Sequence, residues 1–276
     1  MLIDSSFQIV LMTFFGGVAA VMAIETVWPL RAVSGTPVWR WINNLALTVV
    51  DYAVLLGISP WLALLVVNLV GMDNPGLLHK AGAGPWVSFF MVLFCLQFAA
   101  YWLHRAFHAV PVLWRIHTVH HCDPEVDATT ANRHHPLEPI IGALAMLPVV
   151  VILGPDPVAI LGYNILVAAV AVVSHGNFSF GPHLDGLLRL FIVTPDFHRM
   201  HHSTERQYTD SNYSTILPVF DYVFRTATRL PTEQQKTMRL GLPYFRDRKF
   251  SRLDQMFLIP FLPRRSPDQQ PLPNKA

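Results

Sequence analysis

The sequence predicts an all-α integral membrane protein with about four to five transmembrane or re-entrant helices and a histidine-rich helical cap on the cytoplasmic side. Three observations predict this fold. Only 14% of the 276 residues are charged, against about 25% in an ordinary soluble domain, and 52% are hydrophobic. The charge deficit is concentrated in long uncharged runs. The more polar segments carry most of the thirteen histidines, so the chain divides into apolar spans and a polar cap.

Three apolar runs are long enough to cross a bilayer, which takes about 20 residues. They cover residues 7–28, 45–70 and 86–103. The second run holds Asp51 as its only charge and Pro60 as an expected kink, and the third leads directly into His104. Two shorter runs, 140–153 and 158–174, are separated by a Gly-Pro-Asp-Pro turn signal. This pair forms either a tight spanning hairpin or a re-entrant pair.

The chain accordingly divides into three parts. Residues 1–85 are expected to form N-terminal transmembrane helices, and residues 86–228 a catalytic domain that contains the histidine groups. Residues 229–276 form a cytoplasmic C-terminal tail, whose Pro- and Gln-rich end is expected to be disordered. The first residues carry no basic segment of the kind that precedes a cleaved signal, so the first apolar run is expected to stay as an anchor.

Short loops with an excess of Lys and Arg face the cytoplasm. The loop after the first span carries Arg31 and Arg40 and no acid, and the segment after the third span carries Arg105, Arg115 and Arg133. Both are therefore placed in the cytoplasm. The hydropathy suits a bacterial inner membrane and an endoplasmic reticulum alike, and the absence of an obvious retrieval signal favours the bacterial membrane.

Charge and cysteine content exclude other classes. A formal charge of +2 without a dense basic block argues against a nucleic-acid partner. Cys95 and Cys122 form no Cys-x-x-Cys pair and no disulfide framework, and are interpreted as ordinary buried thiols.

Eight histidines lie in three tight groups. The groups are His104-x-x-x-His108, His117-x-x-His120-His121 and His198-x-x-His201-His202. On a helix, residues at i, i+3 and i+4 share one face, so each group directs its imidazoles into one region. Thr194 and Pro195 provide a helix start for the third group. Pro111 is expected to break the helix between the first two groups and to reorient the second toward the first.

This histidine supply indicates more than one metal ion. A zinc site takes about four ligands, whereas eight or more imidazoles suit two ions of higher coordination number. Imidazole binds Fe, Cu, Ni and Zn. The His-Glu-x-x-His pattern of zinc proteases is absent, and so are the Glu-x-x-His pairs of carboxylate di-iron bundles. Iron is the useful choice where the chemistry is dioxygen activation.

The three groups and their flanking residues resemble the fatty acid hydroxylase superfamily, which includes the sterol desaturases. The resemblance covers roughly residues 95–228 and extends to four further segments, namely Arg133-His134-His135-Pro136-Leu137-Glu138, Ser174-His175-Gly176-Asn177, the run from Thr194 to Ser203, and Asp210-Ser211-Asn212-Tyr213. The chain departs from the family pattern at Ser214, where many relatives have Gly, and at residues 220–226. These departures concern the subfamily and substrate handling more than the metal groups.

The resemblance implies an integral-membrane enzyme with two iron ions that uses dioxygen and reducing equivalents on C–H bonds of lipids or sterols. It implies that His104, His108, His117, His120, His121, His198, His201 and His202 are metal ligands and that His175 is a ninth. His135 is either an additional ligand or a structural or orienting residue. Asp210 is a candidate partner for a ligand imidazole, and Glu138, Asp127 and Asp196 are weaker candidates. His134, His183 and His79 are interpreted as structural.

The expected reaction is hydroxylation or desaturation of a lipid-like substrate, with no catalytic residue beyond the metal ligands. The sequence contains no GxGxxG fingerprint and no CxxCH haem attachment, so a separate donor must supply electrons: a ferredoxin, a cytochrome b5-like protein or a reductase. The alternatives are a metal or proton transporter, a membrane b-type cytochrome and a non-catalytic metal-binding protein. The histidine groups lie at span ends and in polar segments, which argues against the transporter.

Overall fold

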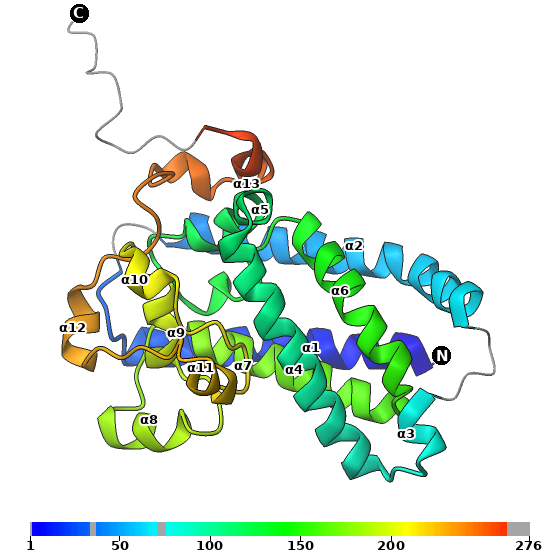
Figure 1. Ribbon diagram of the computed structural model, residues 1–276. Helices are drawn as coiled ribbons and strands as arrows, with labels where there is room; N and C mark the ends of the chain where they lie inside the picture. The colour runs from blue at the N-terminus through cyan, green and yellow to red at the C-terminus, as the bar shows by residue number, and fades with distance from the viewer. Residues whose placement is uncertain (1, 34–36, 71–75, 264–276) are drawn as a thin grey trace, which may run out of the picture.

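A computed structural model describes residues 2–33, 37–70 and 76–263 of the chain. Long helices lie side by side at one end of the molecule, and short helices form a cap at the other (Figure 1). The long helices are α1 (Leu2–Val27), α2 (Val38–Val70), α4 (Pro85–Ala109), α6 (Leu137–Leu153) and α7 (Pro157–His175). The cap contains α5 (Pro111–His121), α8 (Pro182–Leu188), α9 (Pro195–His201), α10 (Arg206–Thr209), α11 (Val219–Val223), α12 (Thr232–Thr237) and α13 (Leu253–Leu258), with the 3-10 helices η1 (Ala128–Thr130), η2 (Arg248–Ser251) and η3 (Ile259–Phe261). No β-strand occurs in the described ranges, which confirms the all-α prediction.

Four helices are long and apolar enough to cross a membrane. They contain the segments Ser5–Val27, Val38–Asn68, Pro85–Ala109 and Pro157–His175. In the expected hairpin, α7 is long enough to span the membrane. The other helix, α6, has 17 residues and is about 26 Å long, which is shorter than the roughly 30 Å of a hydrocarbon core. The helix α2 continues through Pro60 without interruption.

The apolar helices pack as a bundle, in which α6 and α7 diverge from the turn that joins them (Figure 1). α1 packs along α7, while α4 packs against both α6 and α7, and α2 packs against α6. The turn between α6 and α7 uses Gly154 in the left-handed region, at φ 54°. Gly76, at the start of α3 (Gly76–Lys80), presses against this turn so closely that a Cβ there would lie 2.4 Å from the Gly154 Cα. The two glycines thus let α3 pack closely against the turn between α6 and α7.

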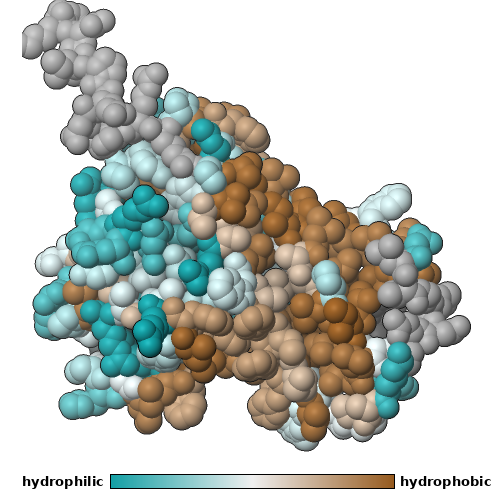
Figure 2. Space-filling view, in the orientation of Figure 1, coloured by the Kyte–Doolittle hydropathy of each residue, from teal (hydrophilic) through white to brown (hydrophobic). Residues whose placement is uncertain are grey.

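Surface hydropathy follows this division. Hydrophobic residues cover the long helices, and hydrophilic residues gather over the cap (Figure 2). Exposed large side chains on the helices include Trp61, Trp86 and Phe90, at 72%, 75% and 60% exposure. Such an apolar surface is stable facing lipid and is a liability in water. The chain is therefore a membrane protein.

A buried polar network joins the bundle to the cap. The Glu25 carboxylate near the end of α1 accepts hydrogen bonds from the backbone N–H of Ala128 (2.9 Å) and of Asn177 (2.7 Å). Arg133 is fully buried, and its guanidinium donates to the Val119 carbonyl, to the Asn44 side chain of α2 and to the Phe250 carbonyl. Since burying an unpaired charge is expensive, these groups fix the cap in one position on the bundle.

The C-terminal part is folded onto the cap as far as residue 263. Met256 and Ile259 are buried and pack in one apolar cluster with Leu47 of α2 and Val119 of α5. The segment expected to be disordered, 264–276, lies outside the described residues.

A candidate metal centre formed by nine histidines

Four helices bring the histidine groups together. α4 ends at Ala109, and Val110 then adopts an extended conformation (φ −93°, ψ 118°), so α5 starts in a new direction, as Pro111 predicted. The third group lies on α9, where the Thr194 hydroxyl caps the helix by accepting from the Phe197 N–H at 3.3 Å. His175 is the last residue of α7. Each group is thus placed at or near a helix terminus in the cap.

The nine imidazoles divide into two groups. The first consists of His104, His108, His117, His121 and His201, and the second of His120, His175, His198 and His202. Within each group one nitrogen per ring lies within 4.8 Å of all the others. All nine side chains are shielded from solvent, and His201 and His202 are completely buried. The structure therefore places every histidine predicted as a ligand in one of two compact clusters.

Hydrogen bonds fix the ring tautomers. The Nδ1 atoms of His104, His201 and His175 lie 2.6, 2.7 and 2.7 Å from the backbone carbonyl oxygens of Tyr213, Ser211 and Ala171. A carbonyl oxygen can only accept, so each of these Nδ1 atoms carries the proton. In a neutral ring the Nε2 atom then presents a lone pair to the interior of its cluster.

The Nε2 atoms face one another at short range. His104 Nε2 lies 3.0 Å from His201 Nε2 and 3.1 Å from His117 Nε2 in the first cluster. His175 Nε2 lies 3.1 Å from His198 Nε2 in the second. Lone pairs that face each other repel, whereas two nitrogens bound at right angles to one cation, each at about 2.1 Å, lie about 3.0 Å apart. The donor set thus fits a metal ion in each cluster.

Burial keeps the imidazoles in the form that binds metal. It lowers the pKa of His117 to about 3 and lowers the pKa values of His121 and His201 well below the ordinary 6.5. A buried imidazolium loses hydration that a neutral ring does not need, so the neutral form is favoured at pH 7. Metal binding consequently requires no deprotonation at neutral pH.

Two carboxylates support ligand rings. Glu138 accepts from His117 Nδ1 at 2.8 Å, and Asp210 lies 3.3 Å from His108 Nδ1 and also accepts from Arg206. A carboxylate in this position orients the ring and raises its basicity toward a metal. Glu138 therefore contacts a predicted ligand at shorter range than Asp210, although the sequence ranked it lower.

The other predicted carboxylates have different partners. Asp127 accepts from Arg40 and Trp41 and caps η1, and it contacts no histidine. Asp196 pairs with Arg199 at 2.8 Å. Both stabilise the cap rather than a ligand ring.

His135, His79 and His183 belong to neither cluster. His135 lies outside both clusters: its Nδ1 accepts from the Leu137 N–H at 3.2 Å, and its ring packs against Phe257 and Phe261. The His79 and His183 side chains are exposed.

His134 was interpreted as structural, yet its ring stacks on His120 at 4.5 Å and lines the cavity described next. Only the resemblance around residues 133–138 pointed to this segment, and nothing in the spacing distinguishes His134 from its neighbour His135.

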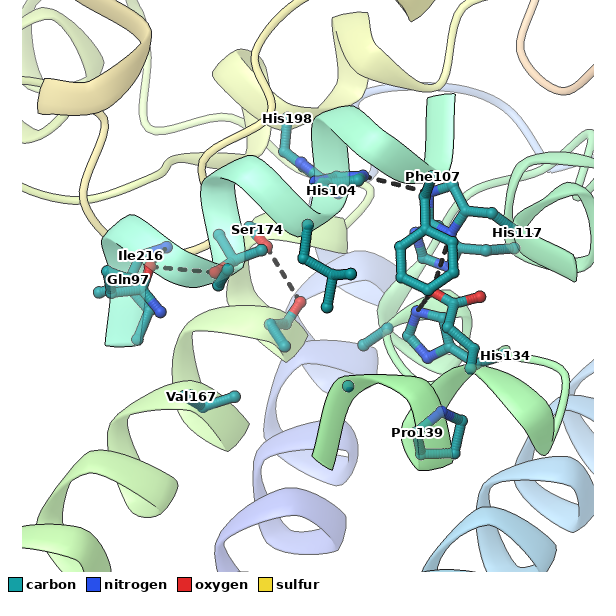
Figure 3. A pocket seen from close by; sticks show the side chains of 18 of the residues that line it. Gln97, His104, Phe107, His117, His134, Pro139, Val167, Ser174, His198 and Ile216 are labelled. Carbon is teal, nitrogen blue, oxygen red and sulfur yellow. Dashed lines mark hydrogen bonds and ion pairs between the residues drawn. The ribbon is translucent and has the colours of Figure 1, made fainter. Parts of the chain in front are cut away.

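A cavity of about 330 Å³ opens beside the clusters. Its metal-side wall is formed by His104, His117, His120, His175 and His198. Apolar side chains from α4, α6 and α7 form most of the remaining wall, with Phe107 close to His117 and Val167 farther away (Figure 3). The cavity follows the divergence of α6 and α7, so it extends from the metal clusters into the apolar bundle.

A membrane bundle capped by two buried all-histidine clusters, with an apolar cavity alongside, defines a polyhistidine membrane metalloprotein. A family model for fatty acid hydroxylase matches residues 89–226, half of the chain. The chain belongs to the fatty acid hydroxylase family, which confirms the resemblance inferred from its motifs.

Curated relatives agree with this assignment. Human alkylglycerol monooxygenase is 28% identical over 160 residues, which cover 56% of this chain and 33% of the relative. The rice very-long-chain aldehyde decarbonylase GL1-6 is 28% identical over 184 residues, covering 64% of this chain and 26% of the relative. The Arabidopsis very-long-chain aldehyde decarbonylase CER1 is 28% identical over 155 residues, covering 53% and 24%. The chain thus spans a third or less of the length of these relatives. No solved structure matches it.

Proposed function

We propose that this chain is a membrane-bound di-iron oxygenase that hydroxylates or desaturates a lipid-like substrate with dioxygen and an external electron donor. The observation that carries the proposal is the division of nine buried imidazoles into a cluster of five and a cluster of four, with Nε2 atoms 3.0–3.3 Å apart. The family and the relatives, which are lipid-modifying enzymes by name, support the reaction type.

Iron supplies the redox chemistry in this proposal. Hydroxylation balances as R–H + O₂ + 2 e⁻ + 2 H⁺ → R–OH + H₂O, so the reaction requires two electrons from an external donor, and iron ions held by the two clusters would supply the redox chemistry. All-nitrogen ligation is compatible with iron, and the burial of both clusters shields them from bulk solvent.

The chain's own residues contribute orientation and exclusion of water. Glu138 and the backbone carbonyls of Tyr213, Ser211 and Ala171 hold ligand rings in the tautomer that presents Nε2. The apolar wall of the cavity holds an alkyl chain against the clusters without polar competition. Because α6 and α7 diverge beside the cavity, we propose that a lipid enters from the bilayer between them.

Orientation follows from the distribution of cations. Among the described residues, Lys80 is the one Lys or Arg at the bundle end opposite the cap, and all others lie at the cap end. We therefore propose that the cap faces the cytoplasm of a bacterial inner membrane. The electron donor, a ferredoxin, a cytochrome b5-like protein or a reductase, then docks on the cap.

Metal content tests the metal assignment. We expect about two irons per chain after purification in mild detergent, and none in a variant with His120, His121, His201 and His202 changed to alanine. The matched control changes the exposed His79 and His183 to alanine and keeps the iron. A folded parent that holds no iron and cannot be loaded with it would remove the proposal.

Turnover tests the reaction. Iron-loaded protein in lipid nanodiscs, supplied with a reductant and ¹⁸O₂, is expected to place one ¹⁸O atom in an alcohol product or to form an alkene. Product formation without reductant would contradict the scheme. Metal flux across proteoliposomes, without oxidation of lipid, would support the transporter instead.

A further inference from the structure

The cavity contains one polar site that the metal chemistry does not use. Gln97 of α4, Tyr163 of α7 and Thr215 all line the cavity and are joined by hydrogen bonds. The Gln97 side chain is 2% exposed. In Figure 3, Gln97 and Ile216 lie at the opposite side of the cavity from His117 and His134. We call Gln97, Tyr163 and Thr215 the polar subsite.

Hydrogen-bond direction in the polar subsite is fixed by the backbone. The Ile216 N–H can only donate, and it lies 2.9 Å from Gln97 Oε1, so this atom is the carbonyl oxygen. Gln97 Nε2 therefore faces Tyr163 and donates to its hydroxyl oxygen at 3.2 Å. Thr215 donates its hydroxyl proton to Gln97 Oε1 at 3.0 Å.

Two hydrogen-bonding functions are left over. The Tyr163 oxygen accepts from Gln97, and its own proton meets no acceptor in the described ranges of the chain. The Thr215 oxygen has donated its proton and keeps lone pairs that accept. Within one cavity, the polar subsite thus offers one donor and one acceptor. An unsatisfied hydroxyl at membrane depth is costly, so a ligand that pairs with both functions gains free energy there.

The polar subsite carries no charge. The described side chains that line the cavity include no Lys or Arg. Glu138, the one carboxylate among them, accepts a hydrogen bond from His117 at the metal side. A phosphate or carboxylate group would be buried here without a counter-ion, which is strongly unfavourable. The chemistry selects a neutral oxygen function.

We propose that the polar subsite binds the hydroxyl group of a neutral lipid alcohol whose alkyl chain extends to the histidine clusters. This inference rests on the proposed function, because it assumes that the cavity is the substrate site. Tyr163 donates to the alcohol oxygen, and the alcohol proton is donated to Thr215. Gln97 is a positioning residue, because its side-chain amide is hydrogen-bonded to both the Tyr163 and the Thr215 hydroxyl groups.

The distance between Gln97 and His104 along α4 sets which carbon of a bound alcohol lies beside the histidine clusters. Gln97 precedes His104 by two helical turns, which separates them by about 10 Å along α4, the length of about eight extended methylene groups. Oxidation is therefore expected at a carbon counted from the hydroxyl group, independent of total chain length.

Binding is tested without turnover. Thermal unfolding of the protein in nanodiscs is followed by tryptophan fluorescence with graded mole fractions of 1-dodecanol, its methyl ether, dodecane or dodecanoate. One hydrogen bond contributes a factor of about five in affinity. The ether, which makes one hydrogen bond, is therefore expected to stabilise at about fivefold lower mole fraction than dodecane, and the alcohol, which makes two, at about 25-fold lower. Dodecanoate is expected to stabilise least.

Two conservative variants separate the functions. Tyr163→Phe is expected to weaken the alcohol and the ether alike, because both need its donor. Thr215→Val is expected to weaken only the alcohol, because the ether has no proton to donate. Tyr222→Phe, which removes a hydroxyl bonded to the Arg189 carbonyl outside the cavity, is the control and leaves all four responses unchanged.

Equal stabilisation by dodecanol and dodecane, or an unchanged alcohol response in Tyr163→Phe, would overturn the polar subsite. If the alcohol binds as expected and iron-loaded protein makes no oxidised product, the proposed function fails and the subsite stands.

Discussion

Replacing Glu138 tests whether the cap is built to hold metal through oriented imidazoles. The carboxylate accepts from His117 Nδ1 at 2.8 Å, and the two side chains are only 3% (His117) and 11% (Glu138) exposed. Loss of a hydrogen-bonded carboxylate behind a ligand histidine lowers metal affinity by about 10- to 100-fold. Glu138→Gln keeps an acceptor oxygen and removes the charge, so we expect about 10-fold. Glu138→Leu removes both and is expected to approach 100-fold, or about 2.7 kcal/mol.

The assay is a titration of metal-free protein with Fe²⁺ in the presence of a competing chelator, with bound metal measured by elemental analysis. Glu233→Gln is the matched control, since the Glu233 side chain is 78% exposed and pairs with Lys236 on the surface. Folding of each variant is checked by circular dichroism. Folded Glu138 variants that bind iron within twofold of the parent would refute the role assigned to the carboxylate.

Further predictions concern single histidine variants, the pH dependence of stability and the cap of α9. His201→Ala and His198→Ala each remove a proposed ligand from a different cluster, so each variant is expected to retain about one iron per chain by elemental analysis. Loss of both irons from either variant would show that the clusters do not fill separately. Because burial lowers the pKa of His117 from 6.5 to about 3, the unfolded chain binds more protons than the folded metal-free chain below pH 6.5. The stability of the metal-free protein is therefore fully present above about pH 6.5 and falls as the pH drops toward 3, and a Tm that stays constant from about pH 8 to about pH 4 would contradict this. Thr194→Ala removes the cap of α9 and is expected to cost about 1 kcal/mol in unfolding by denaturant, whereas the exposed Thr237→Ala is expected to cost nothing measurable.

The sequence predicted the bundle and the grouping of the histidines because both depend on local patterns. Apolar runs define spans by length alone, and the i, i+3, i+4 spacing defines a helix face. The break at Val110 followed from Pro111, whose ring excludes a continuous helix. The cap of α9 by Thr194 followed in the same way.

Features that depend on tertiary packing could not be predicted from the sequence. His134 and His135 are adjacent, yet one stacks on His120 and the other packs against Phe257. No local rule distinguishes them, because the choice is made by the direction in which the chain enters α6. The rank of Glu138 below Asp210 has the same origin: four candidate carboxylates look alike until the fold brings one to His117.

The two His-x-x-His-His groups show how identical spacing serves opposite roles. In the group on α5, the i and i+4 residues, His117 and His121, belong to the five-histidine cluster, and His120 belongs to the four-histidine cluster. In the group that begins on α9 the assignment is reversed, since His198 and His202 belong to the four-histidine cluster and His201 to the five. Each group therefore contributes to both clusters.

This exchange explains why the spacing needs an adjacent pair. An i, i+4 pair, whose members lie about 40° apart around the helix, supplies two imidazoles to one cluster. The residue at i+3 lies about 60° from residue i and about 100° from residue i+4, and it belongs to the other cluster. The rings confirm how close the clusters are: His121 stacks on His202 of the other cluster with centroids 4.7 Å apart. Moving the adjacent residue from i+3 to i+2 would turn it by about 100° and remove it from the shared face. The His-x-x-His-His order thus lets one helix contribute to both clusters, whereas the His-x-x-x-His pair on α4 contributes to one cluster.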